Sequence, residues 1–138
     1  MIEVIDDFLT ASYHEEILNF VSSGSMMWHY CPNITSDTGN DLGHEGFSSL
    51  LVDSNHHVPP SPLVSLIMPC LFQIKDHLDS PKILRARLDM TLYHPYCIPH
   101  KEHTDMEIPH YSAVYYLNNS DGNTIIGDRE VAPRANRV

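Results

Sequence analysis

The stretch ILRARLDMTLY, residues 83–93, alternates between apolar and polar side chains. One face would carry Leu84, Ala86, Leu88, Met90 and Leu92, and the other Arg85, Arg87, Asp89, Thr91 and Tyr93. A period of two residues is typical of a β-strand with one buried face. The stretch therefore predicts a strand, whose polar face either meets solvent or lines a barrel and meets a polar ligand there. Periodicity alone leaves both alternatives open.

Two segments that follow this strand also favour β-structure. YSAVYYLN, residues 111–118, is rich in aromatic and branched side chains, which suit a strand. NNSDGN, residues 118–123, is a turn signal that leads into TIIGD, residues 124–128. We therefore expect antiparallel β-structure across the C-terminal two-fifths of the chain.

The start of the chain predicts one short strand and one helix. IEVI, residues 2–5, is the expected strand. Ser12 followed by Glu15 is a capping-box pattern, and it predicts a helix that ends near Gly24. We expect the helices of this half to pack against the C-terminal sheet.

The middle of the chain predicts a loop, a strand and a second helix. Residues 33–46 are rich in Gly, Asn, Asp and Ser and favour turns, so we expect a loop there. GFSSLLVD, residues 46–53, predicts a strand. Ser61 followed by Pro62 predicts the start of a helix, and Pro69 should kink or split that helix because proline lacks the N–H that the preceding turn needs.

Length and composition limit the classes of protein. The 138 residues suit a single domain, and the formal charge of −10 argues against nucleic acid or an anionic membrane as a partner. Three cysteines without a C-x-x-C pair, namely Cys31, Cys70 and Cys97, fit a reduced protein in which they fill the core. The N-terminus carries acids where a signal peptide carries bases, so we expect a soluble, cytoplasmic protein.

The segment HKEHTDME, residues 100–107, concentrates candidate metal ligands. An H-x-D pattern arises by chance about once in a chain of this composition, and the sequence contains two, at residues 77–79 and 103–105. His77 lies at the predicted end of a helix, where residues two apart point to nearly opposite sides. The first pattern therefore predicts no metal site.

His103 and Asp105 follow a strand and a proline-containing turn. In extended backbone, side chains two residues apart point the same way, so this imidazole and this carboxylate could bind adjacent positions of one metal ion. They would be two of the three ligands of the 2-His-1-carboxylate triad of non-haem Fe(II) oxygenases. The alternative is a polar loop pair in which Asp105 orients the imidazole.

The other polar residues near this pair are expected to play lesser roles. His100 is interpreted as a supporting or surface residue, because an irregular turn separates it from His103. His110 is interpreted as a surface or strand-start residue, and Glu102 and Glu107 as supporting or surface residues. His100 remains a rival ligand in one alternative given below.

Taken together, these features resemble the 2-oxoglutarate and Fe(II)-dependent oxygenase superfamily, especially the small prolyl-4-hydroxylase-like proteins of phage and marine bacteria. The resemblance covers nearly the whole chain, and it rests on VIDDFLTASYHEEILNFV, MMWHY, GFSSLLVDSN, PPSPLVSLIMPCL, HTD, YSAVYYLNNSDGNTII and VAPRANRV. It implies a mainly β fold with N-terminal helices, in which a double-stranded β-helix, or jelly-roll, similar to that of cupins forms the core.

The resemblance also implies the cofactors and the residues that hold them. His103 and Asp105 would be Fe(II) ligands, and Tyr93 would donate a hydrogen bond to the cosubstrate 2-oxoglutarate. Ascorbate would be an accessory reductant, and the substrate a peptide or a small molecule to be hydroxylated. The chain departs from the family because the second iron histidine and the basic residue that pairs with 2-oxoglutarate do not follow VAPRANRV.

That departure leads to three expectations. The chain should be a fragment of a longer protein that lacks its C-terminal strands, and it should have little activity alone. Arg134 and Arg137 should be plain surface charges. A sheet that lacks strands keeps an open edge, so we expect the chain to self-associate through that edge.

Two other functions remain open from the sequence. One is a cupin-like binding or interaction module without catalysis, in which the histidines are incidental. The other is a zinc-dependent hydrolase that uses His100, His103 and Asp105, provided that these side chains converge on one ion.

Overall fold

The structure is a computed structural model that describes residues 1–34, 44–96, 98–100 and 102–138. These residues form two compact units. The first unit combines Met1–Met26 with Ser112–Val138, and the second unit is Met27–Tyr111. Each unit is described by itself below.

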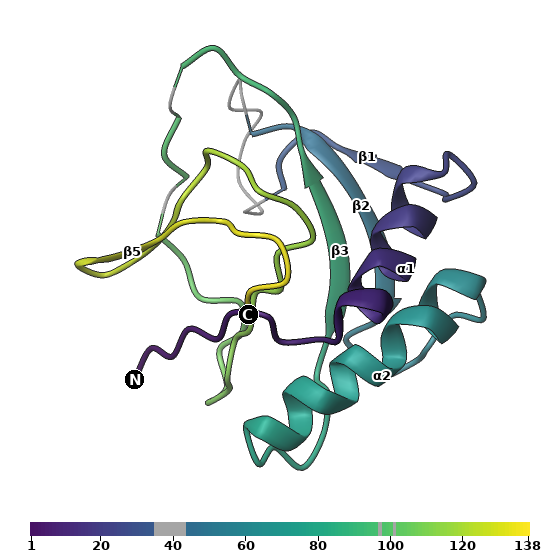
Figure 1. The fold of residues 1–138 in the computed structure, drawn as a ribbon. Coiled ribbons are helices and arrows are strands. Elements are labelled where there is room, and N and C mark those ends of the chain that lie inside the picture. The colour runs from purple at the N-terminus through teal and green to yellow at the C-terminus, as the bar shows by residue number, and fades with distance from the viewer. Residues whose placement is uncertain (35–43, 97, 101) are drawn as a thin grey trace. The chain divides into compact units, whose positions relative to one another are not determined.

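The second unit contains a three-stranded antiparallel sheet (Figure 1). Its strands are β1 (His29–Cys31), β2 (Gly46–Val52) and β3 (Ala86–Thr91), and β2 lies between the other two. The predicted strand over residues 46–53 is confirmed. The strand predicted over 83–93 is confirmed only for its central residues. β1 was not predicted, because three residues are too few to show a period.

Across this sheet, side chains of similar polarity lie opposite each other on neighbouring strands. Tyr30, Phe47 and Met90 stand opposite one another on the three strands, and the rings of Tyr30 and Phe47 meet edge to face, with their centroids 5.8 Å apart. Ser48 faces Asp89 in the neighbouring pair. Gly46 opens β2, and a Cβ atom there would overlap the Ile34 side chain and the Met90 carbonyl oxygen. The close approach of the β3 backbone and of the Ile34 side chain at this point therefore requires glycine.

Helix α2 (Pro62–His77) completes the second unit. The Ser61 hydroxyl accepts a hydrogen bond from the Val64 N–H at 3.1 Å, and Pro62 occupies the first turn, as predicted. Pro69 lies inside the helix without splitting it. The buried apolar side chains of this unit come from α2, from β2 and from the segment after β1: Leu63, Val64, Ile67, Cys70, Leu51, Val52 and Ile34.

The first unit begins with an irregular segment and helix α1 (Ala11–Ser22). The predicted cap at Ser12 is wrong, because the helix starts at Ala11 and Thr10 occupies the cap position without a side-chain hydrogen bond. Ile17 is the buried side chain of this helix. Gly24 has a φ of 73° just after the helix ends, which is the usual position for a glycine that stops a helix.

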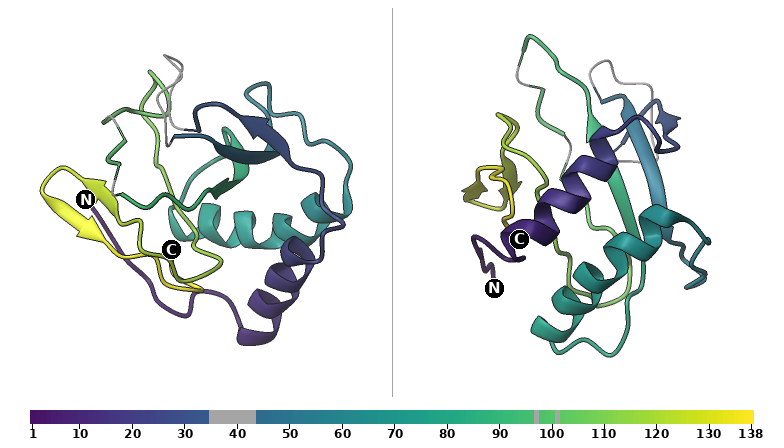
Figure 2. Two further views of the ribbon diagram at one scale, coloured as in Figure 1. Left: turned by 90° about the horizontal axis from the view of Figure 1, so that it is seen from above. Right: turned by 45° about the vertical axis from the view of Figure 1, so that its right-hand side comes forward.

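The C-terminal part of the first unit is a hairpin of β4 (Thr124–Ile126) and β5 (Arg129–Val131), visible as a projecting ribbon in Figure 2. Gly127, with a φ of 61°, forms the tight turn between the strands. The Tyr116 hydroxyl donates a hydrogen bond to the Thr124 hydroxyl at 2.6 Å. The β-structure expected over residues 124–128 is confirmed for Thr124–Ile126, whereas residues 118–123 are irregular with bends.

The last three residues lie between two other segments of the first unit. The Val138 and Ile5 backbones exchange hydrogen bonds of 2.8 and 3.0 Å, and the Arg137 carbonyl accepts one from the Tyr116 N–H at 2.8 Å. The strands predicted over 2–5 and 111–118 are wrong as regular strands, because each contributes only isolated backbone pairs of this kind.

The protein is therefore a mixed α/β fold with two helices and small antiparallel sheets. The described strands form no closed barrel. Neither α1 nor α2, the helices of the described segments, has the length and the apolar content to cross a membrane. Most of the loop predicted over residues 33–46 lies outside the described residues, and so does Cys97.

Candidate functional site

His103 and Asp105 lie in the irregular segment 102–110, which follows β3 in the second unit. The extended strand expected there is absent, yet the two side chains still approach each other. The Nε2 atom of His103 lies 4.0 Å from Oδ1 of Asp105. Both side chains are partly accessible, with exposed fractions of 41% and 40%, so a small ion could reach them from solvent.

The spacing of these two atoms is close to what one metal ion requires. Two ligand atoms at right angles, each about 2.1 Å from an ion, lie about 3 Å apart. The observed 4.0 Å is longer, so the side chains would have to close by rotation. Their exposure leaves room for that rotation. The pair could therefore occupy two neighbouring positions of a metal ion only after such a rotation.

Arg85, just before β3, is a competing partner for the same carboxylate. Its Nη2 atom lies 3.4 Å from Oδ1 of Asp105, the oxygen that faces His103. A guanidinium at this distance forms a charge-assisted contact with the carboxylate. A cation that binds Asp105 must share this oxygen with Arg85 or displace the guanidinium. The ion pair is partly exposed, which keeps its strength modest.

Two other histidines, His44 and His100, form a pair in the same unit. The rings of His44 and His100 stand edge to face with their centroids 4.4 Å apart, and His44 is buried. Burial lowers the pKa of His100, and the nearby His44 and His103 lower it further. Protonation of His100 is therefore disfavoured, and a neutral imidazole is the form that can bind a metal ion or accept a hydrogen bond.

The remaining predicted residues lie apart from this pair or have other partners. Tyr93 lies beyond the end of β3 and its side chain is 85% exposed. Asp89, on the polar face of β3, pairs with the Nε atom of Arg87 at 2.9 Å. His110 donates from Nδ1 to the Ile108 carbonyl at 2.6 Å, as a local turn contact. Glu102 is exposed, in keeping with the surface or supporting role expected for it.

Within the segments that the structure describes, no three or more His, Cys, Asp or Glu side chains lie close enough together to hold a metal ion. His100, His103 and Asp105 therefore do not converge as a zinc triad would require. In the other H-x-D pattern, His77 is the last residue of α2, and Asp79 lies beyond the helix with a φ of 48°. That pattern belongs to a helix end, as predicted.

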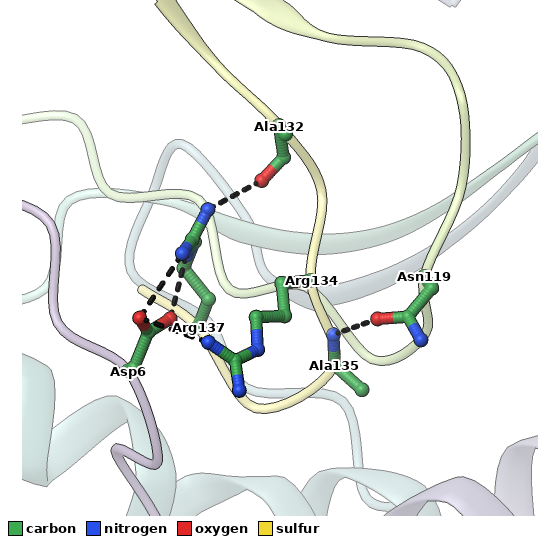
Figure 3. A network of polar contacts seen from close by, with 6 residues as sticks. All are labelled: Asp6, Asn119, Ala132, Arg134, Ala135 and Arg137. Atoms are coloured by element: carbon green, nitrogen blue, oxygen red, sulfur yellow. Dashed lines mark hydrogen bonds and ion pairs between the residues drawn. The ribbon is translucent and has the colours of Figure 1, made fainter.

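A network of polar contacts that was not predicted lies in the first unit. The prediction of plain surface charge at Arg134 and Arg137 is wrong (Figure 3). Arg137 donates two hydrogen bonds to the Asp6 carboxylate, from Nε at 2.7 Å and from Nη2 at 3.0 Å. Arg134 donates a third to the same carboxylate at 3.3 Å. The Arg137 hydrogen bond holds the pKa of Asp6 below its ordinary value, with help from the charges of both arginines.

Arg137 also donates a hydrogen bond within its own loop. Nη1 of Arg137 donates to the Ala132 carbonyl at 2.9 Å, and the Asn119 side chain accepts from the Ala135 N–H at 2.8 Å (Figure 3). These contacts fix residues 132–137 against the start of the chain. The only sequence signal for these contacts was the repeated arginine in PRANR. Asp6, which both arginines contact, lies 131 residues away from Arg137.

Comparisons with protein-family models, curated proteins and solved structures find no match to this chain. The functional interpretation therefore rests on the residues and their geometry.

Proposed function

We propose that this chain is an Fe(II)- and 2-oxoglutarate-dependent dioxygenase domain of the prolyl-4-hydroxylase-like type, which hydroxylates a peptide or a small molecule. The observation that carries the proposal is the approach of His103 Nε2 to Asp105 Oδ1 at 4.0 Å in an H-x-D motif just downstream of β3. The jelly-roll core expected of such an enzyme is part of the same proposal.

In this proposal His103 and Asp105 supply two neighbouring iron ligands, and a second histidine supplies the third. The imidazole must be neutral to bind, and the carboxylate must be ionised. When bound, iron and 2-oxoglutarate would supply the oxidative chemistry, while the protein orients the substrate and keeps positions on the metal open.

The first test is metal binding by the chain as it stands. Mn(II) can replace Fe(II) without oxidation, and its electron paramagnetic resonance signal reports free against bound ion. We expect weak binding by the wild type, because two protein ligands hold an ion less firmly than three. The variants H103A and D105N should lose this binding.

The second H-x-D pattern provides a matched control. H77A and D79N remove the same two side-chain types at the same spacing, at the end of α2. They should bind Mn(II) as the wild type does. If all four variants bind equally, or if the wild type binds no ion at millimolar Mn(II), His103 and Asp105 are not metal ligands and the proposal fails.

The second candidate is a binding or interaction module without a metal, similar to a cupin. The observation that favours it is the Arg85–Asp105 ion pair, which already gives the carboxylate a structural partner. In that case D105N should lower stability and R85Q should lower it by a similar amount, because both break one pair. H103A would then change neither stability nor ion binding.

A further inference from the structure

The expected self-association through an open sheet edge has a candidate location in the second unit, at the outer edge of β3. β3 pairs with β2 along one edge, and no described strand of this unit pairs with its other edge. Such an edge presents backbone N–H and C=O groups to which another strand can add. We propose that β3 pairs with β3 of a second copy of this chain, antiparallel, about a two-fold axis at Leu88.

The polar face of β3 is self-complementary in this register. Arg87 of one copy lies opposite Asp89 of the other, and the axis repeats the same pair. Within each copy, Arg87 Nε already lies 2.9 Å from Asp89 Oδ2. Arg87 Nη2 also donates to the Ile34 carbonyl of its own copy at 2.8 Å. In the proposed pairing each guanidinium would in addition face a carboxylate of the other copy. Opposite charges that face each other across paired strands stabilise the pairing.

The other face of β3 is apolar and pairs in the same way. Ala86 lies opposite Met90 of the second copy, Leu88 lies opposite its own counterpart, and Leu84 lies opposite Leu92 just beyond the strand ends. Met90 is 39% exposed and Leu92 is 46% exposed in the single chain. Strand addition would cover part of both side chains, which is favourable.

The charges also select this register against its neighbours. Residues that stand opposite each other on antiparallel strands point to the same face of the sheet. The two-fold axis must therefore pass through a residue of β3, and another register moves it by whole residues. An axis at Arg87 would place the two arginines opposite each other, and an axis at Asp89 would do the same for the two carboxylates. Like charges directly opposite are destabilising, so Leu88 is the favoured centre.

The net charge of −10 on each copy opposes association at low salt. At physiological ionic strength the Debye length is about 8 Å, so distant charges are screened while the facing pairs remain in contact. Association should therefore be measured at physiological salt, by analytical ultracentrifugation over a range of concentrations.

A charge-reversal experiment tests the register directly. R87D carries acids at both positions, and D89R carries arginines at both. Each variant alone places like charges opposite each other, and its dimerisation should weaken about tenfold. In an equimolar mixture each acid faces an arginine, so heterodimers should form. Both variants lose the pair within the strand, so recovery in the mixture can arise only between copies.

Two further measurements separate loss of pairing from loss of folding. Circular dichroism must show that R87D and D89R keep the wild-type spectrum. In the wild type, the amides of residues 86–91 should exchange with deuterium more slowly as protein concentration rises, while the β4–β5 hairpin, residues 124–131, should not change. A wild type that stays monomeric with concentration-independent exchange, or folded variants whose mixture stays monomeric, would overturn the proposal.

Discussion

The side chain of Asn136 hydrogen-bonds both backbone polar groups of Leu9, 127 positions away in the sequence. Oδ1 accepts from the Leu9 N–H at 2.9 Å, and Nδ2 donates to the Leu9 carbonyl at 2.8 Å. Both residues are buried. The amide of Asn136 thus replaces a strand partner for Leu9, at a point where the chain forms no regular sheet.

Two aromatic side chains extend this contact. The Tyr115 hydroxyl donates to Asn136 Oδ1 at 3.0 Å and lies 2.6 Å from Nδ1 of His14 on α1. Because the hydroxyl gives its hydrogen to Asn136, Nδ1 of His14 must carry the hydrogen that it shares with Tyr115. One polar chain therefore joins α1, residue 115 and the last turn of the protein within the first unit.

Replacement of Asn136 by Ala should destabilise the protein by about 3 kcal/mol, because two buried backbone groups lose their partners. Asn136 also has a φ of 62°, where Ala is strained and Gly is not. N136G therefore separates the two causes, and it should keep most of the loss. Urea unfolding measures both variants. A loss below about 0.5 kcal/mol in N136G would show that the hydrogen bonds contribute little.

Asp6 should make the stability of the protein depend on acid pH. Arg137 and Arg134 hold the pKa of Asp6 below its unfolded value, so the ionised carboxylate stabilises the fold at neutral pH. This contribution is lost as pH falls below about 4 and the carboxylate takes up a proton. The stability difference between wild type and D6N should therefore be constant from pH 7 to about 5 and shrink below that range.

Thermal unfolding at several pH values checks this expectation. D128N, in the hairpin turn, removes an exposed carboxylate of the same unit and serves as the control. A D6N variant whose difference from wild type does not change with pH would contradict the role assigned to the Asp6–Arg137 pair.

G46A should destabilise the sheet by about 1–3 kcal/mol, because an added methyl group meets the Met90 carbonyl oxygen and the Ile34 side chain. The side chain of Ile34 can move, but the backbone of β3 cannot move without loss of its pairing with β2. Gly122, where an added Cβ meets no atom within 4 Å, provides the control. Chemical denaturation of G46A and G122A should give clearly different losses, and equal losses would contradict this packing.

Cys70 should resist thiol reagents in the folded protein. It is buried, and burial raises the pKa of its thiol to about 11, so little thiolate is present at pH 8. In a C97S background, an aromatic disulfide reagent should modify the half-buried Cys31 first. Cys70 should react only in urea. Two thiols that react at equal rates without urea would contradict the burial of α2.

Arg85 should weaken metal binding if the proposed function is right. R85Q removes the cation that shares Oδ1 of Asp105, and Mn(II) should then bind up to about fivefold more tightly, as expected for loss of a competing surface ion pair. R129Q removes an arginine from the first unit, whose Nη1 atom contacts the Ile2 carbonyl, and it should have no effect. Weaker binding in R85Q would instead indicate that Arg85 positions the carboxylate.

Local patterns in the sequence predicted those elements whose signals lie within a few residues. The Ser61–Pro62 start of α2 and the alternation over residues 86–89 were confirmed, because a cap and a two-residue period depend only on neighbours. The segment 111–118 has the composition of a strand. It failed to form one, because a strand also needs a continuous partner, and only Tyr116 finds one.

The sequence predicted which residues form the candidate site but not the backbone conformation that carries them. The H-x-D spacing singled out His103 and Asp105, and the structure places their side chains 4.0 Å apart without the expected strand. The competing Arg85 was assigned only to the polar face of a strand, because its contact with Asp105 spans 20 residues and leaves no periodic trace.

The sequence by itself determined the positions of helix α2 and strand β2, and it singled out the H-x-D pair His103 and Asp105. Each depends on residue types at short, fixed spacings. Tertiary structure alone decided that Asn136 binds Leu9, that Arg137 binds Asp6 and that β3, among the described strands, pairs with β2 alone. These features join residues more than a hundred positions apart or depend on which strand lies beside another, and no local preference encodes that choice.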